Sequence, residues 1–130
     1  MPETSDFQAV FERLKAILQT YESQLLITLN EPGYYSLNTP YSPKFKKELF
    51  FGAVQARKNY VSYHLMPVYV FPSLLDGISP SLRKRMQGKS CFNFRSVNED
   101  TFAELEQLTQ RGYELFKGAF DGNPVSGQVR

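Results

Sequence analysis

The sequence contains few of the residues that build disulfides, zinc sites or membrane segments. It has one cysteine, Cys91, one histidine, His64, and no tryptophan among its 130 residues. A single cysteine excludes an internal disulfide, and one histidine cannot by itself build a three-ligand zinc site. No apolar run approaches the roughly 18 residues that span a bilayer, and the N-terminus lacks the basic and apolar blocks of a signal peptide. We therefore expect a reducing, cytoplasmic location and no membrane partner.

Length and composition are those of one globular domain. A chain of this length buries about two thirds of its unfolded surface on folding. The content of 42% hydrophobic and 22% charged residues argues against disorder. Ten of the nineteen Phe and Tyr residues fall within residues 34–71. This clustering predicts a β-sheet with many ring contacts.

Charge is distributed unevenly, although the net charge is only +2. Residues 1–43 carry a net −3, residues 44–95 carry +8 and residues 96–130 carry −3. The basic middle block predicts a surface that meets an anion. In the alternative interpretation, this block attracts the two acidic flanks within the fold. The modest overall charge and the lack of an aromatic ribonucleoprotein motif argue against nucleic acid as a partner.

Residues 48–72, ELFFGAVQARKNYVSYHLMPVYVFP, predict a central hairpin. This is the longest run rich in β-branched and aromatic residues. Arg57, Lys58 and Asn59 form the predicted turn, and the second strand is expected to end at Pro72. One face of the second strand holds Val61, Tyr63 and Leu65, and the other holds Tyr60, Ser62, His64 and Met66. A ligand is expected on the second face, which mixes polar and apolar side chains.

The N-terminal third predicts one helix and one hairpin. We expect a helix over residues 6–22 that is capped by Ser5, and strands over residues 24–30 and 34–37 joined by a turn at Pro32 and Gly33. Residues 38–47 are expected to form a surface loop. Its three lysines are interpreted as solubilising, with phosphate contact as the alternative.

The C-terminal half predicts three helical segments and one strand. After residue 72 we expect a single helical turn over residues 73–77, and then a helix from Ser79 to a glycine cap at Gly88. A strand over residues 89–95 and a last helix that begins after Asn98 complete the chain. The predicted fold class is α+β: a single domain in residues 1–120, with an antiparallel sheet of about five strands flanked by an N-terminal and a C-terminal helix plus one short helix. Residues 121–130 are rich in turn formers and predict a flexible tail.

Three short features bear on chemistry. Residues 88–90, Gly-Lys-Ser, match the end of a phosphate loop, but position 83 is Arg where that motif needs Gly, and the flanking elements stand in the wrong order. Cys91 lies on a predicted strand, which favours a small buried side chain over a nucleophile. His64 acts as an acid or base only beside an orienting partner, which the sequence does not identify. A packed or hydrogen-bonded role is therefore favoured for His64.

Four segments within residues 44–120 follow one another in a familiar order: YVSYHLMPVYVFP, SPSLRKRMQGKS, CFNFRSVNED and TFAELEQLTQRGYELF. In order and spacing they resemble the YdhG-like domain of unknown function. The resemblance implies an intracellular α+β domain with an antiparallel sheet flanked by helices. Some bacterial relatives are described as frataxin-like iron chaperones, so iron is the one cofactor that the resemblance implies. Iron favours clustered oxygen ligands, whereas the acids of this chain are interrupted by Arg13, Lys15, Arg111 and Lys117.

The sequence leads to the hypothesis of a non-catalytic binding domain for an anionic small molecule or for an acidic segment of a protein partner. The candidate ligand-binding residues are Tyr60, Ser62 and His64, edged by Arg57, Lys58, Arg83 and Lys89. No catalytic residue and no metal ligand is predicted. Two alternatives stay open: a frataxin-like iron-binding chaperone, and an enzyme that uses His64 as an acid or base.

Overall fold

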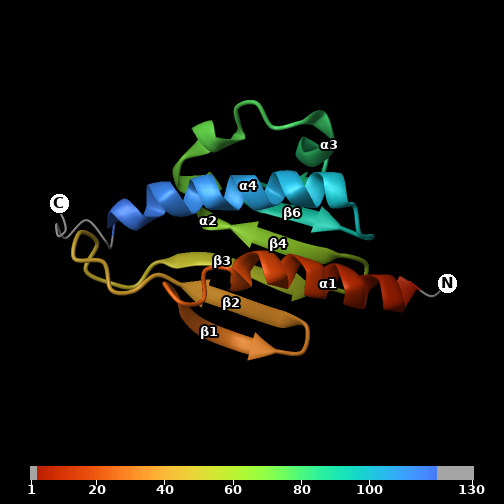
Figure 1. Ribbon diagram of the computed structural model, residues 1–130, viewed down its shortest axis with the longest axis horizontal. Helices are drawn as coiled ribbons and strands as arrows, with labels where there is room; N and C mark the ends of the chain where they lie inside the picture. The colour runs from red at the N-terminus through yellow and green to blue at the C-terminus, as the bar shows by residue number, and fades with distance from the viewer. Residues whose placement is uncertain (1–2, 120–130) are drawn as a thin grey trace.

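Two long helices lie side by side on one face of an antiparallel sheet (Figure 1). The computed structural model describes residues 3–119. The helices are α1 (Glu3–Gln19) and α4 (Glu99–Phe116). The guanidinium of Arg13 on α1 lies 2.9 Å from the carboxylate of Glu99 on α4. Because both helices occupy the same side of the sheet, neither of them covers its other face.

Six strands form the sheet in the order β1-β2-β3-β4-β6-β5, and all neighbours are antiparallel. The strands are β1 (Leu26–Glu31), β2 (Tyr34–Asn38), β3 (Phe50–Ala56), β4 (Val61–Leu65), β5 (Met86–Gln87) and β6 (Cys91–Phe94). The predicted α+β class is confirmed, as are the central hairpin and the hairpin at Gly33, whose φ is 82°. The sheet has six strands where about five were predicted, because β5 was not recognised.

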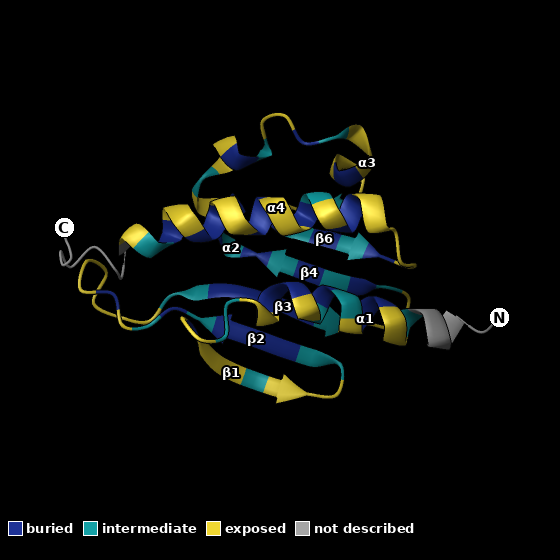
Figure 2. Cartoon of the chain, in the orientation of Figure 1, coloured by how far each residue is buried: buried dark blue, intermediate teal, exposed yellow. Residues whose placement is uncertain are grey.

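The core lies between the sheet and the two helices, as the dark blue faces in Figure 2 show. The apolar face predicted for β4 is confirmed, since Val61, Tyr63 and Leu65 are fully buried. Along α4, the buried residues that face the sheet include Phe102, Leu105, Leu108, Gly112 and Phe116. Inside the core, the phenol oxygen of Tyr63 lies 2.6 Å from the hydroxyl of Thr109. The central strands therefore anchor both long helices.

A β-bulge in β3 directs an extra aromatic ring into the core. The register between β2 and β3 shifts so that Phe51 has no partner residue on β2. Its ring centroid lies 6.0 Å from those of Tyr21, Tyr113 and Phe116. At the next position, a Cβ added to Gly52 would lie 3.2 Å from Leu18 Cδ2, so the glycine lets α1 approach the sheet closely.

Strand β4 ends at Leu65, and the predicted strand up to Pro72 is wrong. The chain forms α2 (Met66–Val70) and then a 3-10 helix, η1 (Pro72–Leu75), which falls near the single helical turn predicted over residues 73–77. Pro67 cannot donate a ladder hydrogen bond and suits the first turn of a helix. These constraints outweigh the strand propensity of residues 68–71. Pro67 packs closely on α4, where a Cβ added to Gly112 would lie 2.9 Å from its Cβ.

The helix predicted from Ser79 to Gly88 is wrong in its length. Helix α3 spans Pro80–Arg83, and the Ser79 hydroxyl caps it as predicted by accepting a hydrogen bond from the Leu82 N–H at 3.1 Å. The chain then enters β5, and Gly88, with φ 75°, forms the turn into β6 instead of closing a helix. The Glu104 carboxylate on α4 accepts hydrogen bonds from the N–H and the hydroxyl of Ser79, each at 2.6 Å. These two hydrogen bonds hold the start of α3 against α4.

The two long helices differ in how well their limits were predicted. Helix α1 spans residues 3–19 instead of 6–22, so Ser5 lies inside it and is not its cap. Helix α4 begins after Asn98, whose side-chain oxygen accepts a hydrogen bond from the Thr101 N–H at 3.2 Å, as predicted. The predicted tail over residues 121–130 lies outside the described residues. No helix within residues 3–119 has the length and apolar character needed to cross a membrane.

Candidate functional site

The sheet face away from α1 and α4, which we call the open face, is built from rows of cross-strand neighbours. One row is Ala53, His64 and Cys91, and the next is Gln55, Ser62 and Asn93. Paired residues of antiparallel strands point to the same side of a sheet. Ser62 and His64 are half-buried, whereas their neighbour Tyr63, which points into the core, is fully buried. The mixed face predicted for β4 is therefore the face that solvent reaches.

A hollow of about 200 Å³, which we call the central hollow, lies on the open face. Arg57, Ser62 and His64, all predicted as ligand-binding residues, line it together with Gln55 and Cys91. The Arg57 guanidinium donates a hydrogen bond to the side-chain oxygen of Gln55 at 3.0 Å. No carboxylate lines this hollow. It offers hydroxyl, amide, imidazole and guanidinium groups to a bound molecule.

The imidazole of His64 is held by two neighbours. Its Nε2 lies 2.7 Å from the hydroxyl of Ser90, and the Phe50 ring meets it edge-on at a centroid distance of 4.9 Å. Burial lowers the pKa of His64 below its ordinary value. Burial therefore favours the neutral form of the ring.

Cys91 lies across from His64 and is half-buried. Burial raises the pKa of its thiol, although hydrogen bonds with Ser62 and Ser90 act in the opposite direction. The thiolate is the nucleophilic form of cysteine. Burial therefore favours the protonated thiol of Cys91, although the side chain is half-buried where a buried one was expected.

A second hollow of about 400 Å³ lies on the same face toward the β5 edge of the sheet. We call it the basic hollow, because Lys84, Arg85 and Arg95 line it with Tyr60 and Asn93. No carboxylate lines it, and none of the three cations has an ion-pair partner among residues 3–119. Cations gathered in this way create a positive potential that attracts an anion.

Short backbone hydrogen bonds bring these residues together. The N–H of Asn93 donates a hydrogen bond to the carbonyl of Arg85 at 2.8 Å. This bond holds Arg85 opposite Asn93 of β6, and Asn93 is two positions before Arg95 in the sequence. Lys84 lies at the C-terminal end of α3. Tyr60 arrives from the turn before β4, where its carbonyl accepts a hydrogen bond from the Arg57 N–H at 2.8 Å. The hollow therefore depends on the turn from α3 into β5.

The structure divides the predicted site residues. Four of the seven line the hollows of the open face: Tyr60, Ser62, His64 and Arg57. Arg83 points elsewhere, since its guanidinium donates a hydrogen bond to the carbonyl of Leu75 at 2.8 Å. Lys58 and Lys89 line neither hollow.

Sequence reasoning missed Lys84, Arg85 and Arg95 as members of one hollow. All three belong to the basic block of residues 44–95, so their charge was noticed. The prediction of a helix up to Gly88 hid the hairpin that places them side by side. A two-residue strand such as β5 leaves no periodic signal.

A third hollow, of about 550 Å³ and mostly apolar, lies beside the loop before β3. Phe45, Tyr69, Val70 and Leu115 line it, and each is 45–55% exposed. Lys44 and Lys47 stand among these apolar side chains. Two of the three lysines that were interpreted as solubilising therefore lie beside exposed hydrophobic side chains.

No protein-family model, curated protein or solved structure matches the chain. The resemblance to the YdhG-like domain therefore stays a prediction. The role of the open face has to be inferred from its geometry and its charge.

Proposed function

We propose that the chain is a non-catalytic binding domain that takes an anionic small molecule on its open face. The observation that supports the proposal is the group of three cations, Lys84, Arg85 and Arg95, around a hollow without carboxylates. Like charges repel one another, so an anion between them lowers the free energy of the folded protein. The two guanidinium groups suit bidentate hydrogen bonds to a carboxylate or a phosphate.

The central hollow extends this site. Ser62 lines the central hollow and Asn93 lines the basic hollow, and the two are cross-strand partners. A ligand whose acidic group lies in the basic hollow can therefore extend its polar body toward His64. The basic hollow, at about 400 Å³, is in the range of small-molecule sites, and the central hollow adds about 200 Å³ beside it. An acidic segment of a protein partner is the alternative ligand for the same cations.

Titration with inorganic pyrophosphate, followed by calorimetry, tests the proposal. We expect saturable binding that weakens as salt increases, because the contacts are electrostatic. In a variant with Lys84→Gln, Arg85→Gln and Arg95→Gln, the dissociation constant should rise at least about tenfold, which corresponds to about 1.4 kcal/mol.

The loop before β3 provides a matched control. Lys44→Gln, Lys46→Gln and Lys47→Gln remove the same number of positive charges outside both hollows. This variant should change the dissociation constant by less than about twofold. An equal loss in both variants would show that pyrophosphate senses only the net charge. Preferential binding of a poly-glutamate peptide would favour the acidic segment as ligand.

One observation favours a second function, an enzyme that uses His64. The Ser90 hydroxyl lies 2.7 Å from its Nε2, as in a nucleophile and base pair. A hydrolytic pair also needs a group that orients the second ring nitrogen. Within residues 3–119, His64 has no hydrogen bond or ion pair with a carboxylate. Hydrolysis of p-nitrophenyl acetate that disappears in Ser90→Ala would support this reading against the binding domain.

The iron-binding alternative rests on the YdhG-like resemblance. Residues 3–119 contain no group of three or more His, Cys, Asp or Glu placed to hold a metal ion. A calorimetric titration with ferrous iron tests this role directly, and saturable heat would support it. A reducing, cytoplasmic setting belongs to the main proposal as well, because Cys91, which lines the central hollow, is a free thiol.

A further inference from the structure

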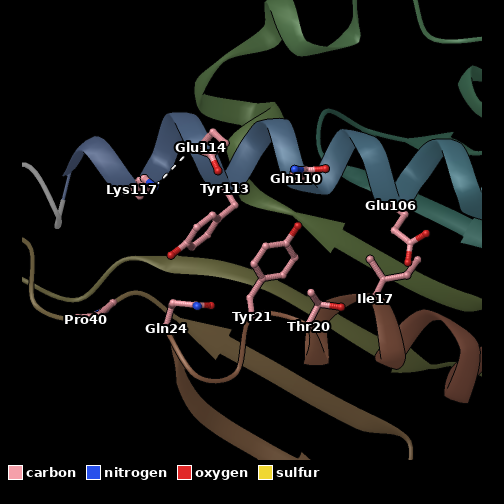
Figure 3. Close-up of a pocket in the computed structure, with 10 residues that line it drawn as sticks. All are labelled: Ile17, Thr20, Tyr21, Gln24, Pro40, Glu106, Gln110, Tyr113, Glu114 and Lys117. Carbon is pink, nitrogen blue, oxygen red and sulfur yellow. Dashed lines mark ion pairs between the residues drawn. The ribbon is translucent and has the colours of Figure 1, made fainter.

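A groove of about 970 Å³ runs between the two long helices, away from the open face. Figure 3 shows its walls: Tyr21 and Gln24 follow α1 on one side, and Glu106, Gln110 and Glu114 project from α4 on the other. The α4 residues are spaced by four, which places them on one face of the helix. These three side chains therefore line the α4 side of the groove.

Aromatic rings form part of the groove wall. The rings of Tyr21 and Tyr113 lie 4.9 Å apart between centroids, at an interplanar angle of 34°. Both rings are supported from below by Phe51, the extra residue of the β3 bulge, at 6.0 Å. An aromatic face attracts a cation through its negative quadrupole, and it also packs against an alkyl chain.

The lining of the groove carries a net negative charge, from two glutamates and one lysine. The carboxylate of Glu106 has no ion-pair partner among residues 3–119, because Arg13 directs its hydrogen bonds to Glu99. Burial raises the pKa of the Tyr21 phenol, and the charges of Glu106 and Glu114 raise it further. This negative groove is distinct in sign and position from the basic hollow.

The chain already places one ammonium group in the groove. The Nζ of Lys117 lies 3.5 Å from the Glu114 carboxylate and 5.9 Å from the centroid of the Tyr113 ring. The ring and the carboxylate thus surround a primary ammonium on two sides. This part of the groove wall therefore already contacts a primary ammonium group.

We propose that the groove binds a linear aliphatic diamine or polyamine, with one ammonium at Glu106 and the other at Glu114. The two glutamates are eight positions apart in α4, which corresponds to about 12 Å along the helix axis. The alkyl chain between the ammonium groups lies against the side chains of Ile17 and Tyr21. The ammonium at Glu114 takes the place of Lys117.

A chain-length series tests the proposal by calorimetry. In extended form, 1,8-diaminooctane is of the order of the span between the glutamates, whereas 1,4-diaminobutane reaches only one of them. We expect the longer diamine to bind at least about fivefold more tightly, and the monoamine octylamine to bind more weakly than 1,8-diaminooctane. Equal affinity for both diamines, or no saturable heat with either, would overturn the proposal.

Variants identify the contacts. Glu106→Gln and Glu114→Gln together should weaken the binding of 1,8-diaminooctane at least about tenfold. Asp76→Asn is the control, because Asp76 is exposed and lies outside the groove, and it should change this affinity by less than about twofold. Lys117→Met removes the internal competitor and should tighten binding about threefold. If Lys117 has a purely structural role, Lys117→Met should not increase the affinity for 1,8-diaminooctane. Unchanged or weaker binding in Lys117→Met, in a variant whose circular dichroism is native, would contradict the proposed position of the ligand.

Discussion

His64 shows how one half-buried side chain makes stability depend on pH. Burial lowers its pKa in the folded protein, while the unfolded chain keeps the ordinary value of about 6.5. As the pH falls through 6.5, the unfolded state therefore takes up a proton first. Stability should be complete above this pH and should decrease as the pH falls toward the folded-state pKa.

Comparison with His64→Gln isolates this effect. Glutamine keeps a polar group beside Ser90 but does not titrate. His64 is the only histidine, so few other groups titrate between pH 5 and 7. Urea unfolding at several pH values should show a steeper loss of stability for the wild type than for the variant over this range. Parallel curves would mean that the burial of His64 does not lower its pKa.

Two of the residues that line the central hollow could be placed from the sequence alone. Period-two alternation in β4 was enough to place Ser62 and His64 on one face, since any strand separates odd from even residues. Ser90, the hydrogen-bond partner of His64, lies 26 residues away in the sequence. Its contribution depends on the pairing of β4 with β6, which no local pattern contains.

The contact between α2 and α4 yields a prediction at the scale of elements. Gly112 lies inside α4, where alanine would ordinarily favour the helix by about 1 kcal/mol. A Cβ at this position would lie 2.9 Å from the Cβ of Pro67, a side chain with little freedom to move. Gly112→Ala should therefore destabilise the protein by about 1–3 kcal/mol, measured as the free energy of unfolding in urea.

Gly118→Ala is the matched control, because nothing lies within 4 Å of a Cβ added there. It should change the free energy of unfolding by less than about 0.5 kcal/mol. A stabilising Gly112→Ala would mean that helix propensity outweighs the clash, and that α2 moves easily away from α4.

Helices and strands with strong local signals were predicted well. Segments whose structure depends on one proline or on a tertiary contact were not. The capped and amphipathic α4 and the central hairpin carry both a period and a start or turn signal. At residues 66–71, strand propensity competes with the constraint at Pro67 and with the docking of α2 on α4. The docking of α2 on α4 is a tertiary contact that no local pattern contains. The sequence alone therefore favours a strand over residues 66–71, where the structure has helix α2 (Met66–Val70).

At the scale of the molecule, the sheet is unevenly protected. Strands β3 and β4 lie in its middle and are covered by the helices, whereas five of the six residues of β1 are exposed. Amide groups exchange slowly where opening requires the core to separate, and quickly at a loosely packed edge. Hydrogen exchange followed by mass spectrometry should show the slowest exchange in β3 and β4 and much faster exchange in β1. Equal protection of β1 and β3 would indicate that another element covers this edge.

Because both long helices lie on one side of the sheet, substitutions along a central strand should have two kinds of effect. In β4, substitutions at Val61, Tyr63 and Leu65 act on folding, because these side chains are fully buried. Substitutions at the half-buried Ser62 and His64 act on the open face and should affect folding less. A saturation scan of β4 should therefore alternate between intolerant and permissive positions. New side chains can therefore be introduced on one side of a scaffold that the other side keeps intact.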